Sequence, residues 1–239
     1  MPLELPLLDQ ADAVPGLPAG VRGWTTTRAN GSFGLGSRES VEDVIGRWTT
    51  LQQELQRFGV ERLACAHQVH GAAVTTHGDG WRGWLRGHGV DGHLTLAAGT
   101  ALAVTVADCT PVFVAHPAGA VAALHAGWRG TAAHILEVGL GLMTRLGFPA
   151  SECVIHLGPA ICGRCYEVGP EVIVAVTGRA ASGKGYLDVR AVLAEQARRL
   201  GVPEITISAS CTKCHNDRFF SHRAGDAGRQ LGVIALASS

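Results

Sequence analysis

The sequence predicts a mixed α/β fold in which strands and helices form layers around one hydrophobic core. Three observations support this: a near-continuous apolar run at 100–106, several segments with helical periodicity, and hairpin patterns without strict strand–helix alternation. The chain has 239 residues, 46% hydrophobic and 17% charged, so it can bury a large core. Because no linker, repeat or low-complexity segment divides it, we expect residues 1–239 to form a single domain.

The expected strands are apolar or β-branched runs bounded by Gly- or Pro-containing turns. They cover residues 21–27, 63–69, 100–106, 111–116, 120–125, 153–157, 205–208 and 232–236. The run 100–106 is apolar at almost every position, which is typical of a strand covered on both faces. The turn Pro117-Ala118-Gly119 predicts a hairpin between the fourth and fifth strands.

Helices are expected where apolar residues recur three or four positions apart. Ser40, followed by an acidic turn, predicts a helix that ends near Phe58. Further helices are expected at 130–146, 172–176 and 189–200. Residues 78–92 are rich in Gly and Trp and are expected to form a loop.

Composition excludes several classes of protein. The 20 basic residues balance the 20 acidic ones, whereas a nucleic-acid binder would carry a basic excess. No apolar run is long enough to span a membrane, and the N-terminal sequence lacks the pattern of a signal peptide. The odd number of cysteines, seven, favours reduced thiols over a disulfide framework. We therefore expect a cytoplasmic protein, either a monomer or a small homo-oligomer.

Three segments place reactive residues at the ends of expected strands. They are His67-Gln68-Val69-His70-Gly71, Ala107-Asp108-Cys109-Thr110-Pro111 and Leu124-His125-Ala126-Gly127-Trp128-Arg129-Gly130. Strand ends next to loops commonly present side chains to ligands. Two imidazoles and one thiolate form a common catalytic zinc set, which leaves a fourth position for water or substrate. His70, Cys109 and His125 are therefore candidate zinc ligands.

Other interpretations of these residues remain open, because their wide spacing matches no compact ligand motif. Cys109 could be a nucleophile activated by His125 or His70, as in cysteine hydrolases. It could also be an ordinary buried thiol. The pairs Cys162-Gly-Arg-Cys165 and Cys211-Thr-Lys-Cys214 could form a structural zinc site or be packed thiols, since their separation exceeds the usual zinc-ribbon gap.

Two arginines are candidate anion ligands. Gly127 and Gly130 flank the start of an expected helix, whose free N–H groups favour an anion, and Arg129 adds a guanidinium there. Arg28, in the loop Thr27-Arg28-Ala29-Asn30-Gly31, could contact phosphate or carboxylate. A surface salt bridge is the alternative for either arginine.

The ordered motifs closely resemble the YfiH-like, laccase-domain family, also called multicopper polyphenol oxidoreductase-like, purine nucleoside phosphorylase-like or peptidoglycan editing factors. The resemblance runs from about Gly23 to Leu236. It rests on HQVHG (67–71), ADCTP (107–111), ALHAGWRG (123–130), GPAICGRCYEVG (158–169) and CTKC…FFSHR…GR (211–229). Five motifs in order are far more specific than any one of them.

The resemblance implies an α/β/α-type domain related to bacterial toxin deamidases, with zinc bound by His70, Cys109 and His125. It implies phosphate-dependent cleavage of adenosine, inosine, guanosine and methylthioadenosine, and deamination of adenosine. The expected partners are thus a purine nucleoside and phosphate, with no nucleic acid or membrane. Copper-dependent phenol oxidation, as in a laccase, and cysteine-type amidase editing of peptidoglycan precursors are the rival activities.

Around this metal set we expect supporting residues. Arg28 and Arg129 could hold phosphate, and Gln68 could orient the base. Asp108 and His67 are candidates for proton transfer, although Asp108 could instead orient a ligand histidine.

The chain departs from the family pattern in two places. The loop after Arg28 lacks the usual Gly-Gly-(Val)-Ser turn and Asn-Leu pair, and His222 replaces the tyrosine of FFSYR. These departures leave the metal set intact but bear on the contacts with the substrate.

Overall fold

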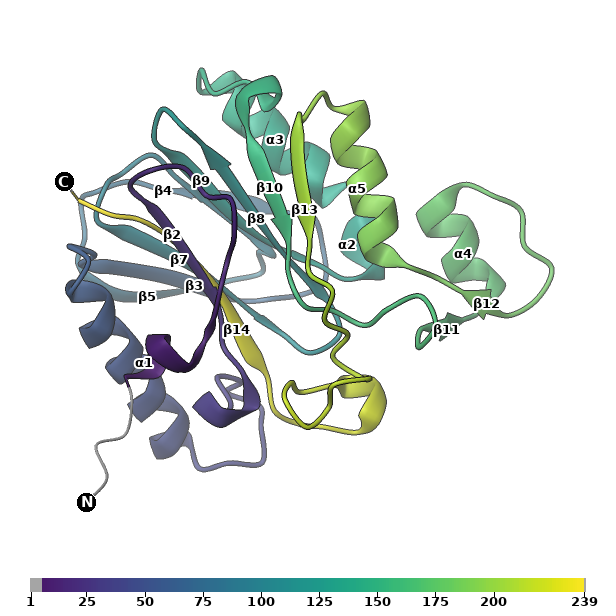
Figure 1. The fold of residues 1–239 in the computed structure, drawn as a ribbon, viewed down its shortest axis with the longest axis horizontal. Coiled ribbons are helices and arrows are strands. Elements are labelled where there is room, and N and C mark those ends of the chain that lie inside the picture. The colour runs from purple at the N-terminus through teal and green to yellow at the C-terminus, as the bar shows by residue number, and fades with distance from the viewer. Residues whose placement is uncertain (1–5, 239) are drawn as a thin grey trace.

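The computed structural model describes residues 6–238, and their strands form two mixed six-stranded sheets (Figure 1). The first sheet contains, in spatial order, β1 (Asp12–Ala13), β2 (Val21–Thr25), β14 (Gln230–Leu236), β7 (Thr100–Val106), β3 (Arg62–His67) and β5 (Gly83–His88). The second contains β13 (Glu204–Ile207), β10 (Val154–Leu157), β8 (Thr110–His116), β9 (Ala120–Ala126), β6 (Gly92–Thr95) and β4 (Val74–His77). A small ribbon pairs β11 (Glu167–Val168) with β12 (Gly185–Tyr186).

The two sheets pack face to face through an apolar layer. Leu102 and Val104 of β7 lie in one buried cluster with Phe113 of β8 and Val121 of β9. Every residue of β8, β9 and β14 is buried, and β7 is buried except at Thr105. This explains why 100–106 is apolar throughout, since its strand is covered on both faces.

Helices cover both outer faces of this double sheet (Figure 1). Helix α1 (Val41–Gln56) buries Trp48, Leu51 and Leu55 against the first sheet. Its N-cap is Ser40, as the sequence predicts, and the Ser40 hydroxyl accepts a hydrogen bond from the Asp43 N–H at 3.1 Å. The other helices are α2 (Trp128–Ala132), α3 (Ile135–Arg145), α4 (Pro170–Thr177) and α5 (Val189–Arg199), and their apolar faces share a core with the second sheet.

The predicted mixed, layered α/β fold is confirmed, and its central β layer consists of two sheets. The predicted hairpin is β8–β9, with Thr110 opposite Ala126. Short 3₁₀ turns complete the chain at Leu7–Gln10, Arg28–Asn30, Ala150–Glu152 and His222–Ala224. Within residues 6–238, no helix has both the length and the apolar character needed to cross a bilayer.

The expectation of a loop at 78–92 is wrong, because β5 pairs in parallel with β3 within it. Trp84 of β5 stacks on Trp48 of α1 with ring centroids 4.8 Å apart, and its indole N–H donates to Cys65 Sγ at 3.1 Å. Tertiary packing thus outweighs the weak strand propensity of a Gly-rich segment.

The expectation of one continuous helix at 130–146 is also wrong. It is divided into α2 and α3, and His134 has φ of 59°, in the left-handed region. Such a residue cannot continue a right-handed helix, so the chain changes direction there.

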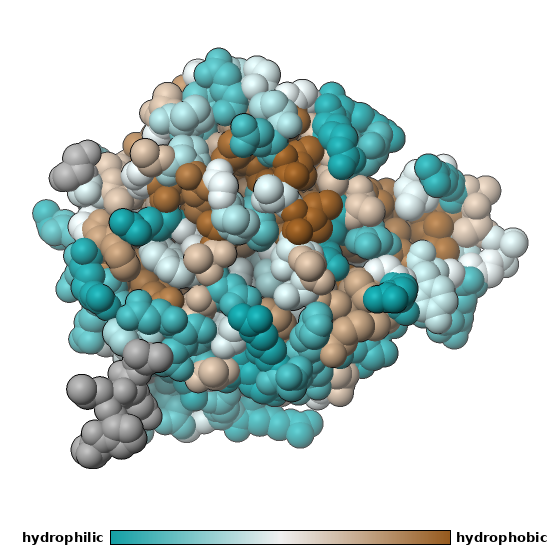
Figure 2. Space-filling view, in the orientation of Figure 1, coloured by the Kyte–Doolittle hydropathy of each residue, from teal (hydrophilic) through white to brown (hydrophobic). Residues whose placement is uncertain are grey.

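The outer edge of the second sheet is β13, a short strand whose residues are mostly exposed. Figure 2 shows hydrophobic surface in the region where Figure 1 places β13 and α4. Ile207 of β13 and Val174 of α4 are exposed apolar residues. A strand this short gives little edge for another chain to pair with.

Candidate metal centre

Three distant segments bring two imidazoles and one thiol together. His70 lies just after β3, Cys109 lies between β7 and β8, and His125 lies near the end of β9. One donor atom from each residue lies within 4.8 Å of the others. The two imidazole rings meet edge to face, with centroids 4.8 Å apart. We call these three residues the triad.

A buried carboxylate, Asp91, positions two of the three triad residues. Its Oδ1 lies 2.8 Å from His125 Nδ1, so the second ring nitrogen of His125 is left for the centre. The same carboxylate accepts N–H bonds from Val69, His70 and Gly71 at 3.1, 2.9 and 2.8 Å. The Asp91 carbonyl also accepts the His125 N–H at 2.7 Å. One side chain therefore holds the His70 turn and the His125 ring in a common frame.

The backbone is strained at two positions of the centre. His70 and Asp108 have φ of 61° and 78°, in the region that non-glycine residues rarely adopt. Such conformations persist only where the surroundings impose them, and they cluster at functional sites. The His70 turn is imposed by the three N–H bonds to Asp91.

Two glycines of the GWRG motif allow the close approach of the segments. A Cβ added at Gly127 would lie 2.8 Å from Cys109 Sγ, and one added at Gly130 would lie 2.8 Å from the carbonyl oxygen of Gly71. Both distances are shorter than van der Waals contact. These positions therefore need glycine for space.

Charges inside the triad favour a thiolate beside an imidazolium when no metal is bound. Burial opposes ionisation of Cys109, but the charges and hydrogen bonds of His125 and His70 outweigh it and lower the pKa of the thiol to about 6. Burial also opposes the charge on His125, but the Cys109 thiolate and the Asp91 carboxylate raise the pKa of the imidazole to about 9. At neutral pH the sulfur is thus already in the form that binds metals.

A cavity of about 600 Å³ opens beside the triad. That volume suits a small organic ligand. All three triad residues line the cavity, together with four of the other residues singled out from the sequence: His67, Gln68, Asp108 and Arg129. The cationic side chains of its lining are Arg86, Arg129, Arg223 and Arg229.

Within this lining, Gln68 and His67 differ in how firmly they are held. The Gln68 amide nitrogen donates to the Thr105 carbonyl at 2.9 Å, and its oxygen accepts from the Thr105 N–H at 2.8 Å. Gln68 therefore joins the loop after β3 to β7. The His67 ring is exposed and stacks on His88, with centroids 4.8 Å apart.

Asp91, not Asp108, is the carboxylate that pairs with the ligand His125. Asp108 Oδ1 accepts from the Thr212 hydroxyl at 2.6 Å, and Oδ2 accepts from the Arg223 N–H at 2.7 Å. The carboxylate thus joins the Cys109 loop to the C-terminal motif. It still lines the cavity, where it could accept or donate a proton.

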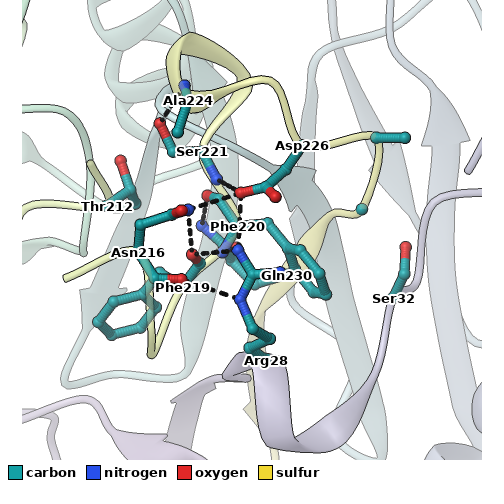
Figure 3. A network of polar contacts seen from close by, with 12 residues as sticks. Arg28, Ser32, Thr212, Asn216, Phe219, Phe220, Ser221, Ala224, Asp226 and Gln230 are labelled. Atoms are coloured by element: carbon teal, nitrogen blue, oxygen red, sulfur yellow. Dashed lines mark hydrogen bonds and ion pairs between the residues drawn. The ribbon is translucent and has the colours of Figure 1, made fainter. Parts of the chain in front are cut away.

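Arg28 is not among the residues that line the cavity, contrary to the expected phosphate contact. Its guanidinium donates to the carbonyls of Asn216 and Phe219 at 2.9 and 3.2 Å and to Asp226 Oδ2 at 2.7 Å (Figure 3). It also lies over the Phe220 ring, 4.5 Å from the centroid. Arg28 therefore holds the FFSHR segment in place.

Sequence reasoning missed several residues of this region. Asp91 lies in the segment 78–92, which was expected to be a loop. The only feature of the sequence that could have indicated it is its position directly before β6, the strand that pairs with β9. The cavity lining also includes Arg223 and Tyr166, to which the sequence analysis gave no role, and His222, which it singled out as a departure from the family pattern. The Arg223 guanidinium lies over the Tyr166 ring at 5.0 Å, although these residues are far apart in sequence.

The donor set of the triad fits a tetrahedral metal ion with one open position. A His₂Cys set would supply three ligands to such an ion, and all three ligand residues line the cavity. The Asp91–His125 contact is the carboxylate–histidine arrangement that orients metal-binding imidazoles.

Comparisons with known proteins agree on one family. Residues 22–237 match the family model for multi-copper polyphenol oxidoreductase laccase. A purine nucleoside phosphorylase of Streptomyces coelicolor is 38% identical over 199 residues, which cover 78% of this chain and 82% of the relative. A protein named adenosine deaminase RL5, from an unknown prokaryotic organism, is 32% identical and covers 97% of this chain and 95% of its own.

Solved structures support the same relationship. The crystal structure of YlmD from Geobacillus stearothermophilus superposes with a TM-score of 0.83 at 33% identity, covering 92% of this chain and 93% of that one. The crystal structure of YfiH from Bacillus licheniformis gives a TM-score of 0.81 at 26% identity, covering 90% and 92%.

Proposed function

Because this chain belongs to the multi-copper polyphenol oxidoreductase family of YfiH and laccase-like proteins, we propose that it is a zinc-dependent enzyme acting on purine nucleosides. The proposed reactions are phosphorolysis of adenosine, inosine, guanosine or methylthioadenosine, and deamination of adenosine. Relatives named for each type of reaction support both halves of this proposal.

One observation carries the proposal: a His₂Cys donor set opens onto a cavity large enough for a nucleoside. A zinc ion held by His70, Cys109 and His125 would supply a Lewis acid and lower the pKa of water. Asp91 fixes the orientation of His125 and the turn of His70, so the protein maintains the geometry without substrate.

Phosphate would be held by arginines of the cavity. Arg129 and Arg223 are exposed residues of the cavity lining, and their guanidinium groups could pair with phosphate oxygens. Arg129 belongs to a helix of only five residues, so its own charge would contribute more than the field of that helix. Asp108 or His67 would transfer the proton that the leaving base or ammonia requires.

The test is product identification with purified protein and adenosine, with and without phosphate, alongside metal analysis. Adenine with ribose 1-phosphate is expected when phosphate is present, and inosine when it is absent. Formation of neither product would refute both reactions. Copper in the protein, with turnover of phenols at enzymatic rates, would instead identify an oxidase.

The affinity of the triad for zinc is expected to rise with pH. In the metal-free protein between about pH 6 and 9, Cys109 is a thiolate and His125 carries the proton that the metal must displace. One displaced proton corresponds to about a tenfold gain in affinity per pH unit, which levels off above about pH 9. Chelator competition across this range measures the slope, and an affinity independent of pH would contradict the pKa assignments.

One observation favours a second activity for the metal-free centre. Cys109, His125 and Asp91 are linked in the order nucleophile, base and orienting carboxylate that cysteine hydrolases use. This arrangement suits cleavage of an amide in a peptidoglycan precursor. An assay on such precursors distinguishes the two activities, since an amidase would survive chelation whereas the zinc-dependent reactions would stop.

A further inference from the structure

The two CxxC pairs are far apart in sequence, but they lie close together at one end of the second sheet. Cys162 and Cys165 follow β10, and Cys211 and Cys214 follow β13. These strands are parallel neighbours with Leu157 opposite Ile207, so both segments leave the sheet at the same end. An isolated bridge between Ala160 and Cys211, with the Thr212 N–H donating to the Ala160 carbonyl at 3.2 Å, keeps them side by side.

The four sulfur atoms have the spacing of a metal centre. All lie within 4.8 Å of one another, and Cys165 Sγ and Cys214 Sγ are 3.4 Å apart. Four sulfurs around a tetrahedral zinc ion, with Zn–S bonds of about 2.3 Å, would be about 3.8 Å apart. The sulfur–sulfur distances therefore need to change by at most about 1 Å for all four sulfurs to coordinate one ion.

Backbone N–H groups already point at one of the sulfurs. The Cys162 N–H donates to Cys211 Sγ at 3.2 Å, and the Cys214 N–H donates to it at 3.4 Å. Hydrogen bonds of this type stabilise a negatively charged acceptor and orient it as a ligand. Arg164 and Lys213 lie between the cysteines of the two pairs, and their charges offset the net negative charge of four thiolates on a divalent ion.

The segments that carry the four cysteines are also packed against the rest of the fold. Cys211 is buried, with 4% of its surface exposed, and a Cβ added at Gly163 would lie 3.0 Å from the Cβ of Asp188. Asp188 is the N-cap of α5, where its side chain accepts from the Ala191 N–H. The first CxxC turn is therefore packed directly against the start of a helix.

We propose that Cys162, Cys165, Cys211 and Cys214 form a closed structural zinc site, separate from the triad. Four thiolates fill the tetrahedron, so no position remains for water or substrate, and the ion stabilises the fold without taking part in the reaction. The 45-residue gap in sequence that argued against such a site is bridged by the parallel β10–β13 pairing.

This zinc site would stabilise the cavity wall. Thr212 lies between Cys211 and Cys214 and donates to Asp108, which lines the cavity. The segment continues to Asn216 and Phe219, whose carbonyls receive the Arg28 guanidinium. An ion at the four cysteines would thus anchor the N-terminal end of the segment that contacts both Asp108 and Arg28.

The test compares zinc content by native mass spectrometry in the full chain and in the double variant Cys165→Ser/Cys214→Ser. Cys165 is half-buried and Cys214 is exposed, so the substitution leaves the buried Cys211 intact. The double variant is expected to hold one zinc ion fewer per chain and to have a lower Tm. Because the readout is a difference of one ion, it does not depend on whether the triad binds zinc.

Two further variants complete the test. Cys153→Ala removes a buried cysteine outside both clusters and is expected to leave the zinc count unchanged. Cys214→His should keep the ion, since Cys₃His sets also bind zinc, and this rescue separates ligation from simple misfolding. Equal zinc counts in the double variant and the full chain would overturn the proposal. So would a disulfide within the cluster under non-reducing conditions, or iron in place of zinc.

Discussion

Cys109→Ala is expected to abolish nucleoside turnover and to reduce the metal content by one ion per chain. Cys109 supplies the only sulfur of the triad, and the two remaining imidazoles form too small a set to retain zinc at ordinary concentrations. The fold should survive, because the side chain is half-buried at the cavity wall, at the edge of the apolar cluster between the sheets. Metal analysis, product assays and circular dichroism on one preparation measure all three effects.

The matched control for Cys109→Ala is Cys153→Ala, which removes the same atom at a fully buried position away from the cavity. It should retain both metal and activity, with at most a modest decrease in Tm. If Cys109→Ala kept its full complement of metal, the assignment of the triad would be wrong.

Asp91→Asn is expected to weaken metal binding by about 10- to 100-fold and to destabilise the fold. Four donors converge on the Asp91 carboxylate, and an amide must turn its NH₂ group towards two of them. A buried donor left without an acceptor costs about 1–3 kcal/mol, so the free energy of unfolding should fall by a few kcal/mol. Chelator competition and urea unfolding measure the two quantities.

Asp108→Asn provides the same isosteric change on a carboxylate with two donors, Thr212 and the Arg223 N–H. It should leave metal affinity near that of the unmodified protein, while activity falls if Asp108 transfers a proton. Equal metal affinity in the Asp91 and Asp108 variants would show that Asp91 does not orient the ligands.

The core strands were predictable because their burial is recorded in local composition. The run 100–106 is apolar almost throughout, and β7 indeed lies between two layers. The same reasoning failed at 83–88, where glycines and polar residues conceal β5. That strand forms because it pairs in parallel with β3 and because Trp84 stacks on Trp48. Both β3 and Trp48 are distant from β5 in sequence.

The helix expected at 130–146 shows another limit of periodicity. Apolar spacing recognises the buried face of α3 but carries no information about the reversal at His134, where the backbone enters the left-handed region. The anion site expected at the start of that helix consequently rests on Arg129 and a five-residue helix, not on a long one.

The sequence by itself determined the layered mixed α/β fold and the three segments that carry His70, Cys109 and His125, because burial and reactive residue types are local properties of the chain. Only the tertiary structure decided how these segments are oriented. Asp91 joins two of them through hydrogen bonds, Arg28 turns away to hold the FFSHR segment, and four cysteines gather where β10 and β13 end. Hydrogen-bond partners and ligand distances depend on strand pairing between residues far apart in the chain, and no local pattern encodes that pairing.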